Sequence, residues 1–188
     1  MASRDGRGTL TSLVRGILGL FGGRSRPSAP ARTPGPSRPT APTTLSPGQD
    51  GQTATREVRP PARGGLTIRY APQRDGAPDA GEVVWTWVPY EENDGRGKDR
   101  PVLVIGHDGA DRVFAVRLTS KAHDGDRDYL SIGTGAWDSQ GRPSWVDIEL
   151  LYSVHVRGMR REAAALDRRR FAGVAAALQG RYGWLSEV

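Results

Sequence analysis

Two short stretches of this sequence carry side chains that could act on a phosphate ester. One is Arg100, which precedes a proline, and the other is the run Thr119-Ser120-Lys121. A guanidinium can hold two phosphate oxygens, and a hydroxyl can add a hydrogen bond that strengthens as charge builds on the phosphorus. RNA brings its own nucleophile, the 2′-OH, so cleavage here would need no protein nucleophile and no metal. A competing interpretation is that Arg100 pairs with Asp99 or Glu92 at the surface.

Neighbouring strands are expected to bring these stretches together. Residues 82–88 and 102–105 are rich in Val, Ile and Trp, which favours strands. Residues 107–111 are typical of a tight turn, and residues 113–118 read as the next strand, so the last two strands should form a hairpin. In an antiparallel pair the start of one strand lies beside the end of the next. Arg100 and Thr119 should therefore meet at one edge of the sheet, under a charged, Gly-rich loop over residues 89–99.

The remaining pattern predicts a small, mainly β domain that ends in a helix. Further strands are expected at residues 129–132, 145–151 and 154–156, which together indicate a small barrel or sandwich. Asp167 is a good N-cap and Gly183 a plausible C-terminal stop for the helix. The apolar residues between them repeat at helical spacing: Phe171, Val174, Ala175, Leu178 and Tyr182.

A Pro- and Arg-rich tail is expected to precede this domain without folding. Residues 22–80 hold eleven of the fourteen prolines and few apolar clusters, so they should not bury enough surface to offset their conformational entropy. Residues 10–21 have apolar side chains at helical spacing, consistent with a weak interfacial or partner-binding helix or with a transient helix without a role. They are too short to span a bilayer, and membrane contact is not expected. The predicted division is 1–21, a short amphipathic segment; 22–80, a disordered linker; and 81–185, the domain.

Charge and composition exclude several kinds of function. The net charge of +6 lies in the tail, because residues 1–65 carry ten Arg, no Lys and three acidic residues. Residues 66–188 carry 17 basic and 18 acidic residues, and a domain so close to neutral is not expected to bind DNA strongly by itself. The chain has no cysteine, which excludes disulfides and thiol chemistry. His107, His123 and His155 lack metal-ligand spacing, and no dinucleotide or phosphate-loop motif is present, so no metal and no cofactor are expected.

The stretch GEVVWTWVPYEENDGRGKDRPVLVIG, followed by FAVRLTSK, resembles the opening of the MazF/PemK toxins. The shared features are a Gly-acidic-Val-Val-Trp strand, a Gly-x-x-Arg-Pro element before an aliphatic strand, and a strand that ends in Thr-Ser. The resemblance implies an SH3-like barrel with a C-terminal helix, and the activity of a metal-independent endoribonuclease that cleaves single-stranded RNA at short sequences. It places Arg100 at the catalytic arginine and Thr119 at the threonine.

The same resemblance implies partners and further site residues. Single-stranded RNA and a cognate antitoxin are the expected partners, with operator DNA bound together with the antitoxin, a homodimeric assembly and a cytoplasmic location. Ser120, Lys121 and Trp85 are assigned to substrate binding. Trp137 could stack on an RNA base or could be a core residue of a long loop. A different class of function stays open: a non-catalytic SH3-like module that binds nucleic acid or a peptide at the same edge of the sheet.

Overall fold

The computed structural model of the chain describes residues 45–73, 77–92 and 94–188. These residues form strands, two short 3₁₀ helices and one α-helix. The strands are β1 (Arg56–Val58), β2 (Thr67–Arg69), β3 (Glu82–Pro89), β4 (Gly97–His107), β5 (Arg112–Thr119), β6 (Tyr129–Gly133), β7 (Ser144–His155), β8 (Arg160–Ala165) and β9 (Leu185–Glu187). The helices are η1 (Gly51–Thr53), η2 (Val156–Gly158) and α1 (Arg168–Tyr182).

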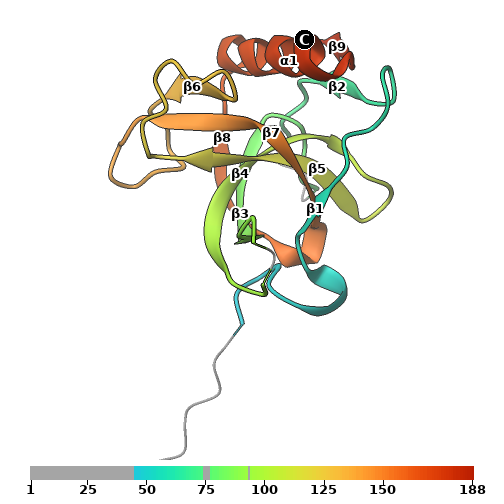
Figure 1. The fold of residues 1–188 in the computed structure, drawn as a ribbon, viewed down its shortest axis with the longest axis vertical. Coiled ribbons are helices and arrows are strands. Elements are labelled where there is room, and N and C mark those ends of the chain that lie inside the picture. Colours follow the sequence, from blue (N-terminus) through green and yellow to red (C-terminus); the bar gives the residue numbers. More distant parts are fainter. Residues whose placement is uncertain (1–44, 74–76, 93) are drawn as a thin grey trace, which may run out of the picture. The chain divides into compact units, whose positions relative to one another are not determined.

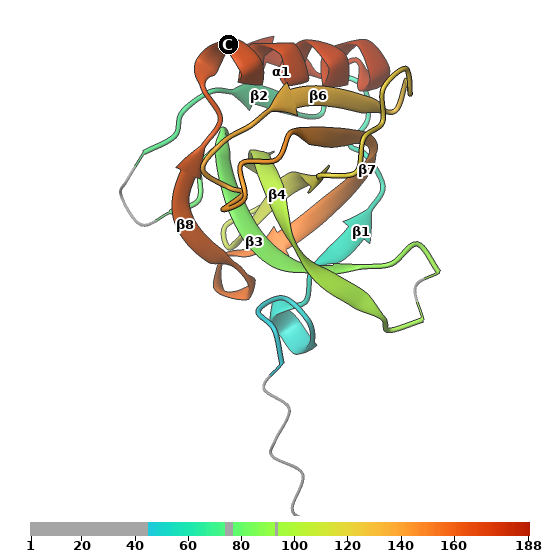
Figure 2. The same ribbon diagram turned by 90° about the vertical axis from the view of Figure 1, so that its left-hand side faces the viewer.

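One curved antiparallel sheet forms most of the fold (Figures 1 and 2). Its strands follow the order β1-β7-β5-β4-β3-β8, and β6 pairs with β7 outside this path. A small parallel pair, β2 with β9, lies beside α1 at one end of the sheet (Figure 1). The prediction of a mainly β, SH3-like domain with a C-terminal helix is confirmed. The hydrogen-bonded path does not close into a complete barrel, because β1 and β8 are not paired with each other within the described chain.

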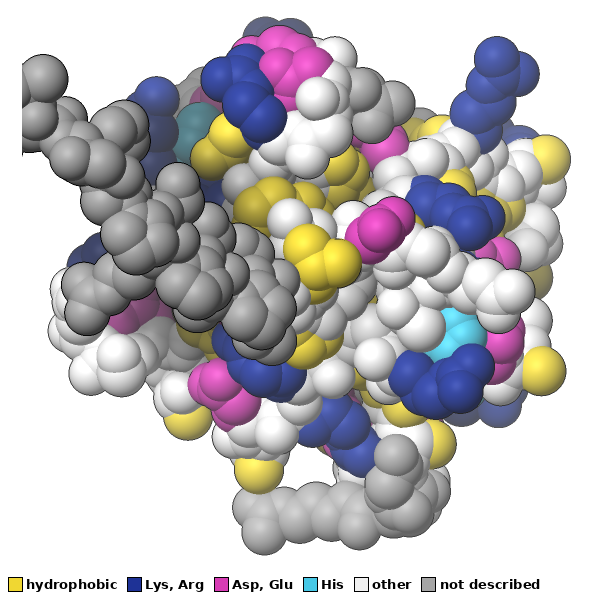
Figure 3. All heavy atoms as spheres, turned by 90° about the horizontal axis from the view of Figure 1, so that it is seen from below, with side chains coloured by type: hydrophobic (Ala, Val, Ile, Leu, Met, Phe, Trp, Pro, Cys, Tyr) yellow, Lys and Arg dark blue, Asp and Glu magenta, His cyan; other side chains and the backbone are white. Residues whose placement is uncertain are grey.

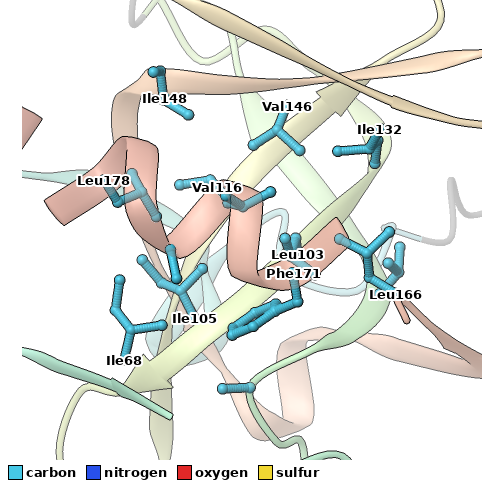
Figure 4. Close-up of a cluster of buried hydrophobic side chains, with 14 of the residues drawn as sticks. Ile68, Leu103, Ile105, Val116, Ile132, Val146, Ile148, Leu166, Phe171 and Leu178 are labelled. Atoms are coloured by element: carbon cyan, nitrogen blue, oxygen red, sulfur yellow. The ribbon is translucent and has the colours of Figure 1, made fainter. Parts of the chain in front are cut away.

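Both faces of the sheet are buried, which explains the continuous apolar runs of its strands. On the face toward α1, Val83, Leu103 and Val116 are cross-strand neighbours. Figure 4 shows this cluster, in which Phe171 and Leu178 of the helix meet the sheet. The opposite face carries a second cluster, of residues such as Val84, Val102 and Ala115, which alternate with the first set along each strand.

The helix forms as predicted. The Asp167 side chain accepts a hydrogen bond from the backbone N–H of Arg170 at 3.0 Å, which satisfies one free donor of the first turn. Gly183 ends the helix in the left-handed region, with φ 69°, a conformation that glycine adopts without strain. The expected apolar positions are buried except Tyr182, which packs at the margin and stacks on Trp184.

The predicted linker needs a correction from residue 45 onward. β1 pairs with β7, β2 pairs with β9, and Leu66 and Ile68 belong to the core beneath α1. Composition argued that this stretch could not bury enough surface by itself, but its strands are completed by partners far along the chain. The predictions for residues 1–21 and for the linker up to residue 44 lie outside the described residues.

Specific polar contacts attach this N-terminal stretch to the sheet. The hydroxyls of Thr55 and Thr86 lie 2.6 Å apart, and Thr86 donates to the carbonyl of Gly158 at 2.6 Å. The guanidinium of Arg112 donates to the carbonyls of Gln52 and Ala54. These contacts make residues 45–58 part of the domain.

Three strand predictions differ in detail from the structure. β4 begins at Gly97, so the loop before it is shorter than expected and Arg100 lies inside the strand, opposite Thr86 of β3. The predicted strands at 145–151 and 154–156 are one strand, β7, except that Val156 begins η2. β8 was not anticipated, because its Arg, Glu and Ala residues do not favour strands; it is completed by pairing with β3.

Candidate functional site

The candidate site lies where β4 and β5 diverge. Their pairing runs from His107 and Val113 to Val102 and Arg117, and no further β4–β5 pair occurs within the described residues. Beyond that point β4 continues beside β3, while β5 continues beside β7, with which it pairs along its whole length, and Thr119 lies opposite Trp145. A cavity of about 420 Å³ occupies the opening between the two strands. The divergence therefore creates a mouth that neither strand forms alone.

All of the predicted site residues line this cavity. They are Trp85, Arg100, Thr119, Ser120, Lys121 and Trp137. Arg100 and Thr119, which were expected at one edge of the sheet, both lie at the walls of this opening. Ser120 and Lys121 are exposed at the end of β5.

Arg100 has no ion pair in the described part of the chain. The Nε of its guanidinium is buried without a hydrogen-bond acceptor. The expected alternative, a surface pair with Asp99 or Glu92, does not occur, because Asp99 binds Arg160 at 2.6 Å instead. A partly buried cation whose donors remain unused is suited to an anionic ligand.

Thr119 is positioned to donate a hydrogen bond into the opening. Its Oγ1 accepts the backbone N–H of Lys121 at 3.1 Å, which fixes the side chain and leaves the hydroxyl hydrogen free. Guanidinium and hydroxyl thus present donors from opposite walls.

Trp85 forms an aromatic wall that is covered on one side by a cation. The guanidinium carbon of Arg160 lies 5.9 Å from the centre of the Trp85 ring, within the range of a cation–π contact. The ion pair with Asp99 holds Arg160 in this place and, through its hydrogen bond, raises the pKa of Arg160 above its ordinary value. The Nε1 of Trp85 is buried and has no acceptor among the described residues.

Trp137 is a core residue rather than an exposed platform. Its side chain is 3% exposed, it belongs to the cluster beneath α1, and its Nε1 donates to Ser144 Oγ at 3.1 Å. Of the two interpretations of this residue, burial favours the core one, since a base can stack only on an accessible ring face. Trp137 therefore forms part of the cavity wall from the side of the hydrophobic core.

The cavity is locally basic although the domain is close to neutral. Lys98, Arg100, Lys121 and Arg142 line it, against the carboxylates of Asp99 and Asp138. Burial acts to raise the pKa of Asp138, but hydrogen bonds from the Gln140 backbone and from Arg142 outweigh it and lower that pKa. Both carboxylates are thus held by arginines. By contrast, Figure 3 shows a face of the molecule on which basic and acidic side chains are interspersed.

Lys98 and Arg142 were missed by the sequence reasoning. Arg142 lies in a loop with no recognised motif, and its place at the mouth depends on the ion pair with Asp138. Lys98 could have been found, because it lies two residues before Arg100 and side chains two apart on a strand share a face.

Other kinds of site find no support in the described residues. No three His, Asp or Glu side chains gather there closely enough to hold a metal ion. In the same part of the chain, no helix is both long and apolar enough to cross a bilayer.

Comparison with known proteins identifies the family. The model of the PemK-like, MazF-like toxins of type II toxin-antitoxin systems matches residues 79–180, more than half of the chain. None of the curated proteins matches the sequence significantly.

The chain is also similar to several solved structures over about half of its length. A chain of the MazE-MazF structure from Deinococcus radiodurans is 23% identical, with a TM-score of 0.44 over 56% of this chain and 96% of that one. A mycobacterial endoribonuclease in complex with its cognate antitoxin is 17% identical, with a TM-score of 0.44 over 57% and 96%. The Mycobacterium tuberculosis toxin MazF-mt6 is 15% identical, with a TM-score of 0.39 over 54% and 97%. On the strength of the family match, this chain belongs to the PemK-like and MazF-like toxins of type II toxin-antitoxin systems.

Proposed function

We propose that this protein is a metal-independent endoribonuclease that cleaves single-stranded RNA in the cavity between β4 and β5. The observation that carries the proposal is the pairing of Arg100, whose Nε has no acceptor among the described residues, with Thr119 on the opposite wall of one basic cavity. Membership of the toxin family supports the same activity.

The reaction needs only the RNA, the cavity and solvent water, which accepts the proton of the 2′-OH and supplies the one that the leaving oxygen gains. The 2′-oxygen of one nucleotide attacks the adjoining phosphorus while the bond to the 5′-oxygen of the next nucleotide breaks. The 2′-OH gives up one proton and the departing 5′-oxygen gains one, so the products are a 2′,3′-cyclic phosphate and a 5′-OH. DNA lacks the 2′-OH and is not cleaved by this route.

Arg100 and Thr119 would act on the charge that develops during this attack. The Arg100 guanidinium serves as an electrostatic stabiliser of that charge. The Thr119 hydroxyl donates to a phosphate oxygen from the other wall. Ser120 and Lys121 contact the RNA backbone on either side of the scissile phosphate. The Trp85 ring forms an aromatic wall beside the RNA strand.

The family also implies the setting in which the enzyme works. A type II toxin is paired with a protein antitoxin, so a cognate antitoxin is the proposed partner. A homodimer, and binding of operator DNA by the toxin-antitoxin complex, belong to the same proposal.

The test compares three forms of the full chain on a long single-stranded RNA in EDTA. They are the parent, Arg100→Ala, and the matched control Arg69→Ala, which removes an exposed arginine on β2. The parent and the control should give discrete fragments with 2′,3′-cyclic phosphate and 5′-OH ends, whereas Arg100→Ala should lose about 10²-fold or more in rate.

Folding of Arg100→Ala should be unchanged, since the residue makes no ion pair within the described chain. Equal cleavage by Arg100→Ala and the parent would refute the assignment. RNA that is bound but left intact by the parent would instead favour the non-catalytic binding module.

A further inference from the structure

A second arginine lies on the same face of the sheet as Arg100. Arg117 of β5 is opposite Val102 of β4, and Arg100 lies two residues from Val102 along β4, so the two arginines are diagonal neighbours. In a regular antiparallel pair such diagonal neighbours lie about 7–8 Å apart, with their Cβ atoms somewhat closer. Two guanidiniums at this separation can reach two successive phosphates of one strand.

Both arginines line a second cavity, of about 500 Å³, on the other side of Arg100. The rest of its lining comes from the β3–β4 connection: Tyr90, Glu91, Glu92 and Arg96. Arg100 is the residue shared by this cavity and the candidate site. An RNA strand whose scissile phosphate lies at Arg100 can therefore continue past Arg100 toward Arg117.

Arg117 is held in place from below. Its Nη2 donates to Asp147 Oδ2 at 2.6 Å, and Asp147, which is 2% exposed, accepts the backbone N–H groups of Glu149 and Leu150 through its other oxygen. Burial opposes the charge of Arg117, but Tyr152 and Asp147 outweigh it and raise its pKa. The side chain is thus a fixed cation.

The remaining donors of Arg117 have no acceptor among the residues that the structure describes. Its hydrogen bonds to Asp147, Tyr129 and Glu91 all start from Nη2, and its Nε is buried without an acceptor in the described chain. The contact with Glu91 is long, at 3.5 Å, and Glu91 is 70% exposed. Glu91 is therefore a loosely held anion that lies where a stronger one could bind.

We infer that Arg117 forms a second phosphate-binding position, which takes the RNA phosphate next to the one at Arg100 and displaces Glu91 from it. This inference rests on the proposed function for the identity of the ligand. It extends the site across β4 and assigns a role to the buried Arg117–Asp147 pair, which the cleavage chemistry at Arg100 and Thr119 does not use.

The test measures binding without cleavage. The probe is a short single-stranded RNA carrying 2′-O-methyl groups, which blocks the nucleophile, titrated with full-length protein over a range of salt concentrations. Arg117→Lys keeps a positive charge for Asp147 but gives up the planar guanidinium that can serve Asp147 and a phosphate together. We expect affinity to fall about tenfold or more and the slope of log affinity against log salt to flatten by about 0.7, the value for one phosphate contact on a single strand.

The Arg-rich N-terminal residues contribute equally to both proteins, so the difference between slopes isolates Arg117. An unchanged slope and affinity in folded Arg117→Lys would overturn the inference, even if the parent cleaves RNA as proposed. A flattened slope would support it, even if the parent proves unable to cleave. A parent that does not bind the methylated strand at all would overturn it as well.

A second variant pair keeps the test decisive if Arg117→Lys does not fold. Glu91→Gln removes the competing anion and should tighten binding several-fold. Glu92→Gln makes the same charge change in the same cavity, but Glu92 forms no ion pair with Arg117. Equal effects of the two substitutions would show that only net charge matters and would contradict displacement at Arg117.

Discussion

The hydroxyls of Thr55 and Thr86 provide a direct test of whether the N-terminal stretch is part of the domain. Both side chains are buried, with 6% and 0% exposure. The Thr86 hydrogen is directed at the Gly158 carbonyl, so Thr55 must be the donor in the contact between the two hydroxyls. The hydrogen bonds thus run from Thr55 to Thr86 and from Thr86 to Gly158, so the Thr55 hydroxyl has an acceptor only while the Thr86 hydroxyl is present.

The magnitudes follow from which groups are left without partners. Thr86→Val keeps the shape of the side chain but leaves both the Thr55 hydroxyl and the Gly158 carbonyl without a hydrogen-bond partner. A buried unsatisfied group costs about 1–3 kcal/mol. We expect a loss of about 2–4 kcal/mol, and a lower melting temperature by roughly 3–5 °C per kcal/mol for a domain of this size. Thr55→Val leaves no hydrogen-bond donor without an acceptor and should lower the free energy of unfolding by about 1 kcal/mol.

The double variant gives the clearest result. In the Thr86→Val background, Thr55→Val removes a hydroxyl that has already lost its acceptor, so it should be neutral or stabilising. The coupling free energy should be at least about 1 kcal/mol, as expected for residues in contact. Urea unfolding followed by tryptophan fluorescence measures all four proteins, and Thr134→Val, at an exposed threonine, is the matched control with an expected change within about 0.5 kcal/mol. Additive effects of Thr55→Val and Thr86→Val would refute the docking of residues 45–58.

Two further predictions concern pH and the tryptophans. Burial is the main cause that raises the pKa of Tyr152, to about 12, so the unfolded chain loses this proton first as the pH rises above about 10. Stability should therefore fall between about pH 10 and 12, and Tyr152→Phe should reduce that fall in urea titrations; an identical pH profile would contradict this account. Trp137→Ala should cost about 3–5 kcal/mol of stability because its ring is in the core, whereas Trp85→Ala should mainly raise the KM for RNA, as steady-state cleavage assays and unfolding curves would show. Reversed effects of the two substitutions would show that the wrong tryptophan has been placed beside the substrate.

Those parts of the fold with a strong local signal could be predicted from the sequence. The helix from Arg168 has a capping aspartate, regular apolar spacing and a terminal glycine, all of which are local properties. The long central strands carry enough Val, Ile and Trp to be recognised, and the antiparallel rule then brought Arg100 and Thr119 together. These features needed no knowledge of distant partners.

The parts that could not be predicted depend on partners far along the chain. β1, β2 and β9 are three residues long, and each is completed by a strand remote in sequence. Averaging composition over residues 22–80 hid the few apolar side chains, such as Ile68, that enter the core. Arg117 and Asp147 are 30 residues apart and nothing local marks them as a pair. The roles of the site residues in cleavage stay predictions until the substitutions are measured.

The divergence of β4 and β5 has a mechanical consequence for the candidate site. Hydrogen bonds tie residues 97–101 of β4 to β3, and they tie Leu118 and Thr119 of β5 to β7. Among the described residues no ladder bond joins these two segments to each other, so the width of the cavity can change by bending of the sheet while every backbone pair stays intact. The separation between Arg100 and Thr119 is therefore a dimension of the site that a bound RNA strand can adjust without breaking a backbone hydrogen bond.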